Sequence, residues 1–202
     1  MKKTQFFMLG IITALGALFL ELLFFTVFNL KMDLSRVYSH SFVLAVILSV
    51  FLEESLKISV LFKILKKIIS EESGQKPVFL SAVMAGLGFS ATEIFLNLFN
   101  LQTNRYFFFL DIFGLLIVHI GTFAILGYVL AKKADFSFPK FALFLPVTFS
   151  FHLLYNILVI YRENSGFYFL FLILSLILIL VFSRDLKKPL KNENLPKSEI
   201  SL

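Results

Sequence analysis

Six long apolar stretches alternate with short polar segments along the 202-residue chain. A helix needs about 20 mostly apolar residues to cross the hydrocarbon core of a bilayer. By this criterion the sequence predicts spans at residues 5–30, 41–62, 78–101, 107–131, 141–160 and 167–182. The pattern therefore predicts an all-α, polytopic membrane protein, a bundle of about six transmembrane helices.

The polar segments between the spans differ in their content of Lys and Arg. The N-terminus, the second and fourth loops and the C-terminal tail together hold 14 of the 19 basic residues, and the other three loops hold 4. Because cytoplasmic loops carry the excess of Lys and Arg, we expect both termini in the cytoplasm. The first span is too long for the apolar core of a signal peptide, so we expect a retained helix.

Composition supports the membrane assignment and narrows the chemistry. Hydrophobic residues make up 58% of the chain and the mean hydropathy is +0.89, against roughly 45–50% apolar residues in soluble domains. Loop topology accounts for the net charge of +6, so no nucleic-acid partner is expected. The absence of cysteine excludes disulfides, thiolate metal sites and cysteine nucleophiles. We expect one transmembrane domain over residues 1–183 and a disordered cytoplasmic tail over 184–202.

The second predicted span carries three charged residues close together, although each charge at the bilayer centre costs about 2.5–3.5 kcal/mol. Glu53 and Lys57 are four residues apart and share a helix face, and Glu54 is turned from them by about 100°. One interpretation of Glu53 and Lys57 is a structural ion pair. The other is a functional site.

The next three spans contribute further polar groups. Glu93 lies in the third span, His119 in the fourth, and His152 and Asn156 share a face of the fifth. With a rise of about 1.5 Å per residue, Glu93, His119 and His152 fall within about 12 Å of one another and of Glu53 in depth. Each taken singly also fits a helix–helix hydrogen bond. Together they predict a shared polar pocket.

The residue types in this pocket suit hydrolysis by activated water. Two carboxyl groups in a low dielectric cannot both ionise cheaply, so one is expected to stay protonated. A carboxylate beside an imidazole can activate water, and a second His with Asn can stabilise an oxyanion. Glu21, Asp111 and His40 lie nearer the outer interface by the same estimate and are interpreted as solvated or snorkelling.

In this order the residues resemble the PrsW family of glutamic intramembrane proteases, within the superfamily of CAAX-processing and bacteriocin-processing membrane proteases (CPBP). The resemblance covers residues 41–160. Its motifs are Glu53-Glu54-Ser55-Leu56-Lys57 for EExxK, Phe89-Ser90-Ala91-Thr92-Glu93 for FxxxE, His119 on the next helix, and His152-x-x-x-Asn156 for HxxxN. One departure from the PrsW pattern is Ile94, where the family often has Asn. The related CAAX enzymes have His in place of Glu93 and an Arg one residue later than Lys57, so the chain resembles PrsW more closely.

The resemblance implies a metal-independent, cofactor-free endopeptidase of the bacterial plasma membrane. Its expected substrate is a membrane-anchored protein, an anti-sigma factor being one example, and a prenylated substrate is disfavoured. The implied catalytic roles are Glu53 as general base, Glu54, Glu93 and His119 as assisting groups, and His152 and Asn156 as oxyanion stabilisers. The oligomeric state is left open.

Two other functions stay compatible with the sequence. The first is a non-enzymatic membrane scaffold, because the same superfamily includes the scaffold subunit of gamma-secretase and buried polar groups also join helices. The second is a proton-coupled carrier, since intramembrane Glu and His also act as proton relays. The carrier is the weaker alternative because no internal repeat is evident.

Overall fold

The computed structural model describes residues 3–28, 40–71, 75–99, 105–132, 137–160 and 165–186. These residues are helical apart from short turns and contain no strand. The helices are α1 (Lys3–Val27), α2 (His40–Glu71), α3 (Gln75–Phe99), α4 (Arg105–Lys132), α5 (Phe138–Ala142), α6 (Leu145–Ile160) and α7 (Ser165–Asp185). The predicted all-α class is confirmed.

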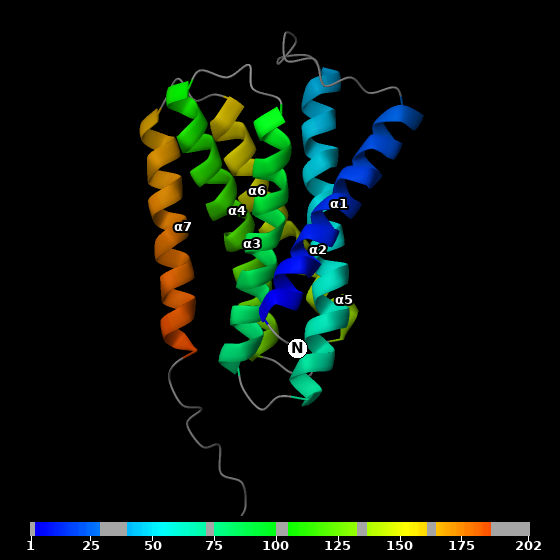
Figure 1. The fold of residues 1–202 in the computed structure, drawn as a ribbon, viewed down its shortest axis with the longest axis vertical. Coiled ribbons are helices and arrows are strands. Elements are labelled where there is room, and N and C mark those ends of the chain that lie inside the picture. The colour runs from blue at the N-terminus through cyan, green and yellow to red at the C-terminus, as the bar shows by residue number, and fades with distance from the viewer. Residues whose placement is uncertain are drawn as a thin grey trace, which may run out of the picture.

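The long helices run alternately up and down the bundle, so that α1 begins and α7 ends at the same end (Figure 1). The basic residues follow this polarity. The described Lys and Arg residues at that end include Lys3, Lys63, Lys76, Lys132, Lys140 and Arg184. They lie at the start of α1, the end of α2, the start of α3, the end of α4, on α5 and at the end of α7. Arg105 stands at the opposite end, at the start of α4.

Among the described residues, five helical segments are long and apolar enough to cross a membrane: α1, α3, α4, α5 with α6, and α7. The remaining predicted span, the second along the chain, is α2, which is 32 residues long. Its membrane-length stretch carries the three charges of Glu53, Glu54 and Lys57 and is therefore less apolar than the others. The structure thus confirms a polytopic membrane bundle, and α2 is distinguished by its buried charges.

The largest differences between the helices and the predicted spans are at the end of α2 and near residue 141. Helix α2 continues to Glu71, nine residues beyond the predicted span end at 62. The residues after the apolar segment include Lys, Leu and Glu, which favour a helix, so the helix extends past that segment. Near residue 141 the span is divided into α5 and α6 by a turn at Leu143 and Phe144. Pro146 lies in the first turn of α6, where its missing N–H costs no helical hydrogen bond. The tail predicted from 184 begins inside α7, and residues 187–202 lie outside the described residues.

Helices α1 and α3 cross through a contact that only glycine permits. A Cβ atom at Gly10 would lie 1.9 Å from the carbonyl oxygen of Ala85, and one at Gly88 would lie 1.9 Å from that of Phe7. Small residues allow such close backbone approach, which is how helices associate within a membrane. This crossing anchors the lower half of α1, whose upper half leans away from α3 (Figure 1).

We expect Gly88→Ala to destabilise the bundle by about 1–3 kcal/mol, because the new methyl group would force α1 and α3 apart. The matched control is Gly166→Ala, since a Cβ atom at Gly166 meets nothing within 4 Å. Thermal unfolding in detergent measures both variants. Equal midpoints for Gly88→Ala and Gly166→Ala would contradict the assigned crossing.

Candidate active site

Helix α2 supplies three charged residues to the interior of the bundle. Lys57 and Glu54 are fully buried, and Glu53 is 8% exposed. The helical repeat brings the Lys57 Nζ within 2.7 Å of Glu54 Oε1 and 3.7 Å of Glu53 Oε2. Glu54 is therefore the closer counter-ion of the ammonium, and Glu53 stands beyond hydrogen-bonding distance.

Lys57 also joins α2 to the third and fourth spans. Its Nζ lies 2.9 Å from His119 Nδ1 on α4 and 4.3 Å from the centre of the Phe89 ring on α3. The ammonium thus contacts a carboxylate, an imidazole nitrogen and an aromatic face, all of which favour a cation. These contacts stabilise a charge that the apolar surroundings would otherwise disfavour.

His119 connects Lys57 to Glu93. Its Nε2 lies 2.6 Å from Glu93 Oε2. An ammonium can only donate hydrogen bonds, so His119 Nδ1 accepts from Lys57 and the ring proton resides on Nε2, which donates to Glu93. Gly86 on α3 permits this approach, because a Cβ atom there would lie 2.9 Å from the Cα of Ile120.

His152 of α6 completes the cluster. Its Nδ1 lies 2.9 Å from Glu54 Oε1 and 3.8 Å from Glu53 Oε2. The ring packs edge-on against His119, with ring centroids 5.0 Å apart and planes at 89°. The Glu54 carboxylate therefore orients His152 as a carboxylate orients the histidine of a hydrolytic triad.

Some buried oxygens in this region are uncommitted. Among the described residues, Glu53 Oε2, Glu54 Oε2 and Ser55 Oγ have no hydrogen-bond partner. An unsatisfied buried acceptor costs about 1–3 kcal/mol, so its retention calls for an explanation. Glu53 Oε2 is the candidate for chemistry, because it faces Lys57 and His152 without being bonded to either.

The side-chain cluster contains most of the residues predicted from the sequence. These are Glu53, Glu54, Glu93, His119 and His152. Asn156 lies one turn beyond His152, half-buried, and forms no hydrogen bond with this cluster. Its role stays a prediction. The Glu93 side chain is the most exposed member at 23%, so the cluster is most open to its surroundings at this carboxyl.

One member of the site was not among the predicted catalytic residues. Lys57 was interpreted only as part of the EExxK motif and as a possible ion-pair partner of Glu53, whereas it contacts residues of α2, α3 and α4. Glu21, which was interpreted as solvated or snorkelling near the outer interface, is half-buried on α1.

The depth of Glu21 was judged from sequence position, which treats every helix as upright, whereas α1 is tilted across the bundle (Figure 1). Asp111, interpreted in the same way, is half-buried, and its backbone oxygen accepts a 3.3 Å hydrogen bond from Tyr155. The side chain of His40 lies outside the described residues.

Three residues of the cluster have the composition of a metal site. Glu53, His119 and His152 each offer a ligand atom, and these atoms lie within 4.8 Å of one another. Two features oppose a cation there. Both ring nitrogens of His119 are hydrogen-bonded, to Lys57 and to Glu93, and the Lys57 ammonium lies 2.9 Å from one of them. A metal ion would have to displace one partner and accept the repulsion of that charge.

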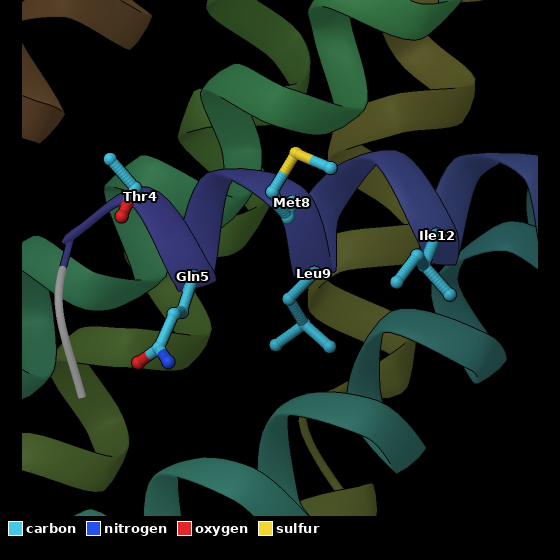
Figure 2. A pocket seen from close by; sticks show the side chains of 5 residues that line it. All are labelled: Thr4, Gln5, Met8, Leu9 and Ile12. Atoms are coloured by element: carbon cyan, nitrogen blue, oxygen red, sulfur yellow. The ribbon is translucent and has the colours of Figure 1, made fainter.

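A separate hollow runs along α1 near its N-terminus. It has a volume of about 330 Å³ and is lined by Thr4, Gln5, Met8, Leu9 and Ile12 (Figure 2). Its walls are almost entirely apolar, and no member of the charged cluster borders it. It therefore lacks the convergent polar groups of a catalytic pocket.

Comparison with known proteins provides no independent assignment. No protein-family model matches the chain, and no curated protein or solved structure shows significant similarity to it.

Proposed function

We propose that this protein is an intramembrane endopeptidase, similar to the PrsW family, that hydrolyses a peptide bond of a membrane-anchored protein. The observation that supports this proposal is the meeting of Glu53, Glu54, Glu93, His119 and His152 from four helices in one buried cluster. A buried set of carboxyl and imidazole groups has the residue types that acid–base hydrolysis requires.

In the proposed first step, Glu53 Oε2 takes a proton from a water molecule. The water oxygen then bonds to the carbonyl carbon of the substrate, and the electron pair of the C=O bond moves to its oxygen. Glu53 is suited to this role because Oε2 has free acceptor capacity. Glu54 Oε2 also has no partner, but Glu54 Oε1 accepts hydrogen bonds from Lys57 and His152. Hydrogen bonds to a carboxylate favour its ionised form, so Glu54 is the weaker base.

In the proposed second step, the oxyanion returns its electron pair, the C–N bond breaks, and Glu53 gives its proton to the leaving nitrogen. His152 stabilises the oxyanion through Nε2, since Nδ1 is committed to Glu54 at 2.9 Å. Glu54 balances any positive charge on this ring. By the family resemblance, Asn156 supplies a second donor to the same oxyanion.

Glu93 and His119 have a supporting role in this proposal. The 2.6 Å hydrogen bond between them and the 2.9 Å contact of His119 with Lys57 hold three helices in a fixed arrangement around Glu53. Fixed catalytic groups lower the entropic part of the barrier. The protonated Nε2 of His119 is directed at Glu93, so His119 is not the base.

A metal-dependent hydrolase is the second candidate, because Glu53, His119 and His152 form a two-histidine, one-carboxylate set. The contacts of His119 with Lys57 and Glu93 favour the metal-independent mechanism. A chelator separates the two. We expect cleavage to be unchanged after exhaustive treatment with a chelator, whereas loss of cleavage and its recovery with Zn²⁺ would establish the metal enzyme.

The proposed location is the plasma membrane of a bacterium, with both termini in the cytoplasm. The basic residues at the end where α1 begins and α7 ends favour this orientation. The substrate would then be a protein with a membrane anchor, such as an anti-sigma factor, that reaches the site within the bilayer.

Reconstitution with single-span membrane proteins tests the proposal. Wild-type protein is expected to cleave a member of the set, and His152→Ala is expected to lower the rate about 10²-fold through loss of oxyanion stabilisation. His152→Ala that cleaves as fast as wild type would overturn the mechanism. Stoichiometric co-purification with a partner and no cleavage would instead support a scaffold, and proton flux in liposomes would support a carrier.

A further inference from the structure

Two glycines of α4 lie opposite two aromatic rings of α6. Gly114 and Gly121 are about two helical turns apart and therefore share a face of α4. A Cβ atom at Gly114 would lie 2.6 Å from Cε2 of Tyr155, and one at Gly121 would lie 2.9 Å from Cε1 of Phe151. Each ring therefore occupies the space that a side chain on α4 would otherwise fill.

The hydroxyl group of Tyr155 contacts the same helix. It donates a 3.3 Å hydrogen bond to the backbone oxygen of Asp111, and Tyr168 of α7 donates a 2.8 Å hydrogen bond to that of Leu110. Both tyrosines are buried. Tyr155 therefore fixes α6 to α4 through its ring and its hydroxyl group, at a point where α7 also contacts α4.

His152 lies on the same turn of α6 as these rings. It follows Phe151 and precedes Tyr155 by less than one turn, so at about 100° per residue it points about 60–100° away from them. Its Nδ1 lies 2.9 Å from Glu54 Oε1 on α2. Side-chain atoms lie about 5–6 Å from a helix axis, so turning α6 by about 20° would move them by about 2 Å. A displacement of this size would break the hydrogen bond between His152 and Glu54.

We propose that Phe151 and Tyr155 are positioning residues for His152. With their rings in the spaces beside the two glycines of α4, they fix the rotation of α6 and so direct the imidazole at Glu54. The catalytic part of this inference rests on the proposed function. The rings matter more than the hydroxyl group, because Phe151 has no polar group and the hydrogen bond of Tyr155 is long for an O–H donor.

The first test reads the orientation of His152 and needs no substrate. The chain has three histidines, so labelling them with ¹⁵N gives a simple NMR spectrum in which the His152 signals are those lost in His152→Gln. We expect Phe151→Leu and Tyr155→Leu, compared at one pH, to shift the Nδ1 signal of His152. The reason is that leucine lacks the ring atoms beside the glycines, so α6 can turn and the hydrogen bond to Glu54 weakens. Tyr155→Phe retains the ring and is expected to leave the signal in place.

The matched control is Tyr128→Leu. The Tyr128 ring of α4 stacks on Phe182 of α7 with centroids 4.3 Å apart, and its hydroxyl group bonds Asp185. This substitution removes a tyrosine between two helices without removing a ring that lies between α4 and α6, so we expect the His152 signal to stay in place. Leucine variants at the two α6 positions whose His152 signal keeps its wild-type position would overturn the proposal. An equal shift in Tyr128→Leu would also overturn it, since general loosening of the bundle would then explain the result.

The second test reads positioning in the cleavage reaction. We expect Tyr155→Leu to lower kcat by roughly 10–100-fold with KM unchanged, since a misplaced oxyanion stabiliser slows chemistry without altering substrate binding. Tyr155→Phe is expected to restore cleavage close to the wild-type rate, and Tyr128→Leu to retain it. A wild-type kcat in Tyr155→Leu would contradict the positioning role. If wild-type protein cleaves no substrate, the proposed function fails, while the NMR result still decides what sets the orientation of His152.

Discussion

Replacing Glu53 with glutamine is expected to lower kcat by about 10³-fold, the contribution of a general base, while the protein stays folded. The amide has the shape of the carboxyl group but cannot take a proton from water. Little stability is lost, because Glu53 Oε2 lies 3.7 Å from Lys57 and 3.8 Å from His152, beyond hydrogen-bonding distance of both. Single-turnover cleavage and detergent unfolding measure the two effects.

Glu54→Gln is the matched comparison, and the opposite balance is expected. Glu54 is fully buried and bonds Lys57 and His152 at 2.7 and 2.9 Å. The neutral amide leaves the ammonium without its closest counter-charge, which we expect to cost about 1–3 kcal/mol of stability. If Glu53→Gln destabilised the protein more than Glu54→Gln and retained cleavage, the roles assigned to the two residues would be reversed.

The sequence predicted the membrane spans because long apolar runs have few alternatives to a transmembrane helix. It did not predict how these helices pair. The crossing of α1 and α3 depends on Gly10 and Gly88 meeting the backbone of Ala85 and Phe7, and no periodicity marks which helix a small residue faces. The turn between α5 and α6 was also missed, because the apolar run continues through it.

The sequence predicted those features of the candidate site that follow from the geometry of single helices. Glu53 and Lys57 share a face because they are four residues apart, and depth along upright helices brought Glu93, His119 and His152 to one level. The partner of each group was not predictable in this way. That His119 would bind both Lys57 and Glu93 depends on how closely three helices approach.

The substitution expected to destabilise the protein most is Lys57→Met, at about 3–5 kcal/mol. Methionine retains much of the side-chain volume but removes the one ammonium that Glu54 Oε1 and His119 Nδ1 both contact. Removing one partner of a buried ion pair leaves the other charge uncompensated, and here Glu54 is fully buried. SDS titration of the protein in mixed micelles measures the loss.

Two comparisons separate this effect from the loss of any lysine on α2. Lys63→Met removes an exposed lysine farther along the same helix and is expected to change stability by less than about 0.5 kcal/mol. Adding Glu54→Gln to Lys57→Met is expected to recover part of the loss, because the double variant no longer buries the unpaired charge of Glu54. If Lys57→Met unfolded like Lys63→Met, the ammonium would contribute nothing to the cluster, and His119 would have no fixed proton position.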